Sequence, residues 1–155
     1  MDKMGEELNQ LVSVEKLSLA TNLIERMISL GKLRHLRILS LGRNKIRRLA
    51  FLEEISGSLE ELWISYNLIE KLDGLEKCSK LNTLFIASNK IHQWDETNKL
   101  ACLPQLKSIL MTGNPIALHC QKEDFIPHLV RRVPQLDTVN GKQVTAEHRT
   151  AGEQL

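Results

Sequence analysis

A pattern of apolar residues and one asparagine recurs at a nearly fixed interval along this chain, and no other feature limits its fold as strongly. In residues 59–72, LEELWISYNLIEKL, the pattern has the form L-x-x-L-x-L-x-x-N-x-I. Its asparagines are Asn22, Asn44, Asn67, Asn89 and Asn114, with steps of 22, 23, 22 and 25 residues between them. A repeat of this length indicates stacked structural units, because one unit is too small to bury its own apolar face.

The residue spacing within one unit indicates its local structure. Side chains of a strand alternate between its two faces, so Leu62 and Ile64 should point into a shared interior together with Leu59. Asn67 lies where the chain leaves the strand, and its amide can bond backbone groups that a buried bend would leave unpaired. This is the pattern of a leucine-rich repeat. It predicts an α/β solenoid with parallel strands on one face, short helices or 3₁₀ turns on the other, and a helical cap at the C-terminal end.

The domain organisation follows from where the pattern starts and stops. A length of 155 residues suits one domain, and we expect a single leucine-rich-repeat domain over residues 1–144. Five repeats occupy about 14–116, and a C-terminal cap occupies about 117–144. The remaining residues, 145–155, are polar and predict a mobile or solvent-facing tail.

The two ends of the predicted solenoid need covers, because the terminal repeats would otherwise expose the core. Apolar residues recur at helical spacing between Lys122 and Val133, which predicts an amphipathic helix that becomes regular near Pro127. At the other end, a short amphipathic turn carrying Leu8, Leu11 and Val12 is expected to lie over the first repeat.

Composition and charge exclude several classes of protein. Apolar residues make up 42% of the chain and charged residues 26%, which is typical of a globular protein. A formal net charge of +2 is too small to indicate nucleic-acid binding by itself. The sequence shows neither a membrane span nor a signal peptide. Its three cysteines, an odd number at irregular spacing, favour a reduced, intracellular setting.

The outward positions of the predicted strands carry an unusual row of large apolar residues. Trp63, Phe85 and Leu110 occupy equivalent positions in consecutive repeats and should stand side by side, with Ile38 nearby. Tyr66 and Arg43 should lie on the adjoining rim. Exposed apolar patches of this kind mark interaction sites, and Trp, Tyr and Arg are enriched at binding hot spots. These six residues are therefore the predicted partner-binding surface; the alternative is that one of the large side chains tucks beneath a neighbour or a loop.

A second feature is a run of basic residues around the second repeat. An acidic surface such as tubulin, or phosphate groups, would be a natural partner for it. Such residues are also the usual solvated outer positions of a repeat, and acidic residues lie close by in the sequence. Both interpretations stay open at this stage. The basic residues are Lys32, Arg34, Arg37, Arg43, Lys45, Arg47 and Arg48.

Catalytic chemistry finds little support in the sequence. The five histidines are scattered, and none shares a motif with a cysteine or a carboxylate pair at the spacing of metal ligands. Cys120 and His128 are eight residues apart with nothing else converging on them. The cysteines are expected to fill space as small apolar residues. We therefore expect no catalytic residue, no metal and no cofactor.

Three segments resemble a known family. They are LRILSLGRN at residues 36–44, LEELWISYN at 59–67 and GNPI at 113–116. They are similar to the leucine-rich-repeat light chain 1 of axonemal outer-arm dynein, and the resemblance covers roughly residues 14–144. LEELWISYN is the most specific of the three, because it includes outward-facing residues that the fold does not require.

The resemblance implies a non-enzymatic light chain in the axoneme of a cilium or flagellum. It would dock on the motor unit of an outer-arm heavy chain, at or near the microtubule-binding stalk tip, and help to regulate motility. By the same resemblance Trp63, Phe85, Tyr66 and Arg43 are heavy-chain contacts, and tubulin is a possible further partner; no nucleic acid or membrane is implied. The alternative is an adaptor of another complex, such as a phosphatase regulator or a ribonucleoprotein component.

Overall fold

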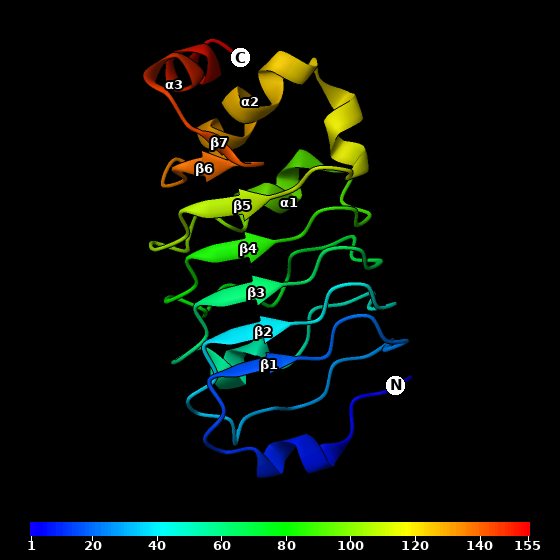
Figure 1. The fold of residues 1–155 in the computed structure, drawn as a ribbon. Helices are drawn as coiled ribbons and strands as arrows, with labels where there is room; N and C mark the ends of the chain where they lie inside the picture. Colours follow the sequence, from blue (N-terminus) through cyan, green and yellow to red (C-terminus); the bar gives the residue numbers. More distant parts are fainter.

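Strands of three residues, one from each repeat, form a parallel sheet along one side of the molecule (Figure 1). The computed structural model describes all residues from Met1 to Leu155. A short hairpin extends the sheet, its first strand parallel to the last repeat strand and its second antiparallel, so that the seven strands follow one another in sequence order. The strands are β1 (Lys16–Ser18), β2 (Ile38–Ser40), β3 (Glu61–Trp63), β4 (Thr83–Phe85), β5 (Ser108–Leu110), β6 (Thr138–Val139) and β7 (Lys142–Gln143).

The sheet is in register, so that equivalent repeat positions are neighbours. The central residues of the five repeat strands pair in series, Leu39 with Leu62 and Leu62 with Leu84, for example. All of these central side chains point inward and are buried. They belong to one apolar cluster of 38 residues that runs from Met4 to Val139. The predicted leucine-rich-repeat solenoid is confirmed, since its parallel strands pair repeat by repeat.

Each repeat asparagine after the first bonds the backbone of its own coil and of the coil before it. The Nδ2 of Asn67 donates to the carbonyls of Ile64, in its own repeat, and Leu41, in the preceding repeat. Its Oδ1 accepts from the N–H of Ile46. Asn44, Asn89 and Asn114 make the equivalent bonds and are likewise buried, whereas Asn22 is only half-buried. These amides satisfy backbone groups that a chain bending inside the protein cannot pair by itself.

The bend next to each asparagine uses a left-handed backbone conformation. The residue before it has a φ of 60° at Thr21, 56° at Arg43, 59° at Tyr66, 52° at Ser88 and 82° at Gly113. Non-glycine residues adopt this conformation infrequently. The ladder of asparagine hydrogen bonds around the bend stabilises it in every repeat.

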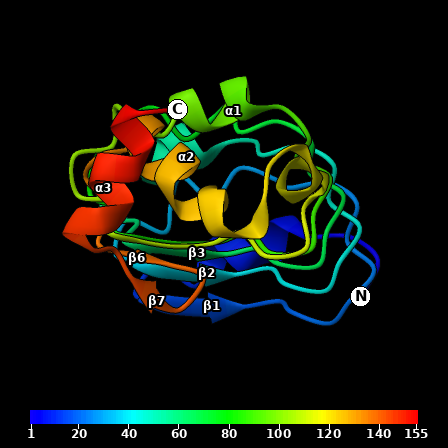
Figure 2. The same cartoon turned by 90° about the horizontal axis from the view of Figure 1, so that it is seen from above.

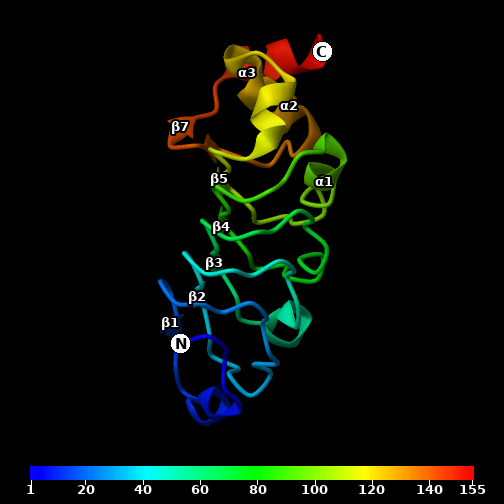
Figure 3. The same cartoon turned by 90° about the vertical axis from the view of Figure 1, so that its right-hand side faces the viewer.

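Short helical segments cover the side of the core opposite the strands (Figures 2 and 3). They are the 3₁₀ helix η2 (Leu52–Ile55) and the helix α1 (Trp94–Asn98), and the other returning segments are turns. Glu96 of α1 is buried, its Oε2 accepts from the N–H of Leu72 at 2.9 Å, and Lys99 pairs with it.

The N-terminal cover is a thin layer, and two of its predicted contacts are wrong. The 3₁₀ helix η1 (Glu6–Gln10) lies beneath the first repeat, with Leu8 packed against the core. Leu11 and Val12, however, are 45% and 51% exposed. Met4 is buried in their place, because the extended chain before η1 reaches the core whereas the turn after it points away.

The C-terminal cap contains the helix that the sequence predicts. The 3₁₀ helices η3 (Pro115–His119) and η4 (Lys122–Asp124) lead into α2 (Phe125–Arg132), which therefore begins two residues before Pro127. Its apolar side, with Leu129 fully buried, closes the end of the core.

The residues after Thr145 are not a mobile tail. Residues Ala146–Glu153 form the helix α3, which packs against α2 at the top of the solenoid (Figure 1). Arg149 donates to the carbonyls of Pro134 and Leu136, and Gly152 is buried. Most of the segment is exposed, as the solvent-facing alternative of the prediction has it, but a small residue at the contact and a guanidinium reaching backbone carbonyls hold it as a helix. No helix anywhere in the structure combines the length and apolar character that crossing a bilayer requires.

Candidate functional site

The outward side of the sheet, which we call the strand face, carries a row of three large apolar side chains. Trp63 of β3 pairs in register with Phe85 of β4, and Phe85 pairs with Leu110 of β5. The Trp63 and Phe85 rings are stacked, with centroids 5.9 Å apart and planes at 23°. All three side chains are half-buried. None of them is fully buried, so part of each side chain is available to another molecule.

Ile38 lies on the same face but not in that row. In the sheet register it is the partner of Glu61, two residues along the strand from Trp63. Ile38 is therefore a diagonal neighbour of Trp63 and does not pair with it directly. Its own row continues through the polar residues Thr83 and Ser108.

Charged groups border the apolar row on the β1 side. The Trp63 indole N–H donates to Oε1 of Glu61 at 3.3 Å, and Nζ of Lys16 lies 4.8 Å from the centre of the indole ring. These contacts fix the orientation of the tryptophan while its apolar body stays at the surface. The strand face thus combines a preformed aromatic pair with an acid and a base beside it.

Arg43 and Tyr66 lie at the bends that follow β2 and β3. The Arg43 guanidinium carbon is 4.3 Å from the centre of the Tyr66 ring, and half of Tyr66 is exposed. Both residues have the left-handed conformation of the repeat bend, so their side chains project at the rim of the strand face. The structure places all six predicted residues, Ile38, Arg43, Trp63, Tyr66, Phe85 and Leu110, on this face or its rim.

The sequence analysis did not predict an apolar hollow that lies beyond β5. It opens between the end of β5, η3, the start of α2 and the hairpin, and Leu118 at its mouth is 86% exposed. The only signal for it in the sequence was the apolar segment that follows Asn114, which repeat spacing alone does not place. The side chains that line it include Met111, Ala117, Leu118, Cys120, Phe125 and Ile126, with Lys122 and Lys142 among its polar residues.

The three cysteines differ in their surroundings. Burial raises the pKa of the Cys78 thiol to about 11, so it is an apolar core residue. Cys102 is exposed, contrary to the expectation that all three cysteines fill space in the interior. No set of three or more His, Cys, Asp or Glu side chains is positioned to hold a metal ion.

Outside the strand face, His128 packs in a small cluster with Trp94 and Arg132. The His128 ring of α2 lies 5.1 Å from the Trp94 ring, and the guanidinium of Arg132 lies 5.0 Å from the centre of the same Trp94 ring. Nδ1 of His128 is buried without a hydrogen-bond partner. Burial, followed by the charge of Arg132, lowers the pKa of this imidazole.

Comparison with known proteins identifies the family. The chain is 50% identical over 155 residues to the axonemal dynein light chain 1 of Xenopus laevis, a match that covers 99% of this chain and 81% of that protein. It is 53% identical to the human protein over 145 residues, which is 93% of this chain and 76% of the relative. The chain belongs to the axonemal dynein light chain 1 family. A more distant member, from Chlamydomonas reinhardtii, is 44% identical over 153 residues, 96% of this chain and 77% of its own.

Other similarities of this family member concern the fold. The family model described as Leucine Rich repeats (2 copies) matches residues 58–97. Among solved structures, a chain of the Drosophila melanogaster SNF/U2A′ complex superposes with a TM-score of 0.84 at 22% identity, over 99% of this chain and 92% of that one. A leucine-rich-repeat protein of Leptospira interrogans gives a TM-score of 0.73 at 25% identity, over 88% and 33%. The likeness to the Drosophila chain shows a shared fold and gives no support to the alternative of a ribonucleoprotein component.

Proposed function

We propose that this chain is a non-catalytic light chain of an outer-arm axonemal dynein, which binds a heavy chain through its strand face and regulates ciliary or flagellar motility. Family membership supports the light-chain role and the axonemal setting. The partner is the heavy chain, and its motor unit near the microtubule-binding stalk tip is the region that the sequence resemblance favours. A direct contact with tubulin would follow from docking there.

The observation that carries this proposal is the row of Trp63, Phe85 and Leu110. The two stacked rings lie outside the apolar core and stay partly exposed, and such a surface is typical of interaction sites. Covering such side chains would contribute about 25 cal/mol per Å² of apolar area, before the costs of association. Because the two rings already stack on each other, they lose little additional side-chain entropy when a partner covers them.

Arg43 and Tyr66 would extend the same contact at the rim. Their stacked geometry leaves the guanidinium N–H groups free to donate to carboxylates of the partner. Hot spots of this composition are typical of protein interfaces.

The experiment measures binding of the purified chain to a recombinant heavy-chain stalk head. The double variant Trp63→Ala, Phe85→Ala should weaken binding by at least about thirtyfold, because each side chain is a candidate hot spot. The matched control is Thr83→Ala, Ser108→Ala, which truncates two residues of the adjacent polar row, on β4 and β5. We expect this control to change the affinity by less than about threefold.

Thermal unfolding of both double variants should show that each remains folded. Equal affinity of the aromatic variant and the unaltered chain for the stalk head would contradict the assignment of the strand face. Copurification of the chain with a phosphatase or a ribonucleoprotein, and its retention in cells stripped of cilia, would instead favour the alternative adaptor role.

A further inference from the structure

The solenoid has a second exposed surface, along the edge where the chain leaves the strands (the right-hand edge in Figure 1). After each asparagine the chain runs extended, and the segments of neighbouring repeats are hydrogen-bonded to one another. The N–H of Lys45 donates to the carbonyl of Ile24, and the N–H of Lys90 donates to that of Ile69, both at 2.8 Å. Only the second residue of each segment is buried, so the first, third and fourth face outward.

These outward positions carry half of the exposed lysines and arginines between Arg26 and Lys90. We call them the basic edge: Arg26, Lys45, Arg47, Arg48, Lys71 and Lys90, all exposed. Three carboxylates, Glu25, Glu70 and Asp73, lie among them, and Asp73 pairs with Lys99. None of the six cations takes part in any of the ion pairs of the structure. Six cations against three carboxylates is a larger excess than the net charge of +2 of the whole chain.

The structure separates these residues from the other basic residues of the second repeat. Arg37 is paired with Glu15 and Glu60, and Arg43 lies over the Tyr66 ring. Lys45, Arg47 and Arg48 instead join cations that come from the neighbouring repeats. The grouping is therefore a product of stacking.

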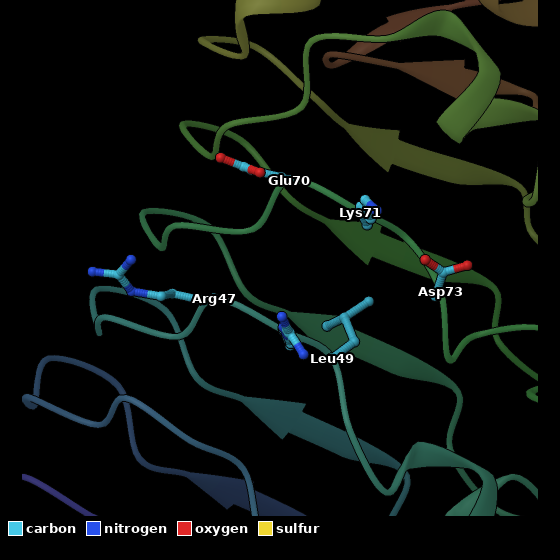
Figure 4. A pocket seen from close by; sticks show the side chains of 6 residues that line it. Arg47, Leu49, Glu70, Lys71 and Asp73 are labelled. Carbon is cyan, nitrogen blue, oxygen red and sulfur yellow. The ribbon is translucent and has the colours of Figure 1, made fainter.

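The cations of the basic edge are neighbours in space. Arg47 and Arg48 line three adjoining hollows, one of which they share with Arg26, one with Lys71 and one with Lys90. In Figure 4 the Arg47 side chain extends away from the ribbon, clear of Glu70. Arg26, Arg48 and Lys71 hold the same repeat position, four residues after the asparagine, in consecutive repeats.

We propose that the basic edge binds an acidic, extended polypeptide segment, and that it is an interaction surface separate from the strand face. Charge complementarity supports this occupant, because several unpaired cations lie in a line along hydrogen-bonded backbone. The carboxylates argue against nucleic acid: Glu25 and Glu70 hold the same repeat position as Arg47. A duplex presents a phosphate about every 1.7 Å along its axis and cannot avoid them, whereas a peptide can space its acidic residues to match.

The test uses a fluorescein-labelled peptide of glutamate pairs separated by single glycines, with binding measured by fluorescence anisotropy at low salt. The edge variant is Arg26→Gln, Arg48→Gln, Lys71→Gln; the next repeat already has a glutamine, Gln93, at this position. The control variant, Lys32→Gln, Lys80→Gln, Lys107→Gln, removes three equally exposed charges elsewhere. Both variants should melt close to the unaltered chain.

We expect the edge variant to bind the peptide about five- to fiftyfold more weakly and the control variant to differ by less than about twofold. Added salt should weaken binding of the unaltered chain, because exposed pairs are screened. Equal losses in the two variants would overturn the proposal, since binding would then follow net charge alone. So would the absence of peptide binding, or tighter, edge-dependent binding of duplex DNA or phosphatidylserine vesicles.

Discussion

The central repeats and the C-terminal cap bury their cores by different means. In the repeats, every coil places the same residue types at the same positions, and Leu62 is surrounded much as Leu39 and Leu84 are. In the cap no position recurs. A tilted aromatic pair of Trp94 and Phe125, with His128 against the indole, joins α1 to α2 there.

One residue shows how the cap imitates the repeats without sharing their sequence pattern. The N–H of Met111 donates to Oδ1 of Asn140, which lies in the hairpin turn with a φ of 52°. The side-chain oxygen of Asn140 thus replaces a strand carbonyl, because in the repeats the equivalent N–H donates to the backbone, as that of Ile86 does to the carbonyl of Leu110. Asn140 is itself the left-handed residue, whereas in the repeats the left-handed residue precedes the asparagine. In the repeats, the contribution of a residue to stability can therefore be inferred from its repeat position. In the cap, stability depends instead on single contacts between segments that are distant in the sequence.

The comparison predicts the largest loss for a truncation inside a repeat. Leu62→Ala removes a fully buried side chain between two equivalent leucines and should cost about 2–5 kcal/mol of unfolding free energy. Ser108→Ala, an outward residue of the same sheet with no side-chain hydrogen bond, should stay within about 0.5 kcal/mol. Chemical denaturation of the two variants measures the difference; similar losses would mean that the inward register is wrong.

Removing one asparagine of the ladder should have the next largest effect. Asn67→Ala leaves the Ile46 N–H and three carbonyls without this partner, and should cost about 1–3 kcal/mol. The control is Asn98→Ala, at an exposed position at the end of α1. Hydrogen exchange at Ile46 should speed up in the first variant alone, and an unchanged melting temperature there would contradict the structural role of the ladder.

A substitution in the cap tests whether a single close contact holds α3. A Cβ added at Gly152 would lie 2.7 Å from the carbonyl oxygen of Pro127, so Gly152→Ala should cost about 1–2 kcal/mol as the helix end moves away. Gly57→Ala is the matched control, since nothing lies within 4 Å of the added atom there. If both variants unfold at the same temperature, α3 is not anchored by this contact.

The smallest expected effect is a loss of stability at acidic pH that arises from protonation of His128. Because burial and Arg132 lower its pKa in the folded protein, the unfolded chain binds a proton first as the pH falls below the ordinary value of 6.5. Stability from this group is therefore complete above that pH and decreases until the folded pKa is reached. His128→Gln should flatten the pH dependence of the unfolding free energy below the ordinary pKa of 6.5, and an unchanged slope would remove His128 as its source.

Much of the fold and of the strand face could be predicted, because the position of a residue in the repeat indicates whether its side chain points inward or outward. Trp63, Phe85 and Leu110 were placed side by side by counting along the repeat. Ile38 was placed less well, since the register of the sheet sets it one pleat away. The helix α3 and the hollow around Leu118 lie outside the repeats, so the repeat pattern did not predict them.

The sequence by itself determined the solenoid, its inward leucines, its asparagine bends and the apolar row on its outer side, because strand alternation and a constant step leave one arrangement. Only the tertiary structure decided how the ends close and which basic residues form ion pairs or stack on an aromatic ring. Met4 replaces Leu11 in the N-terminal cover, and Gly152 admits α3 against α2. Those outcomes depend on distances between segments far apart in the chain, which local patterns do not encode.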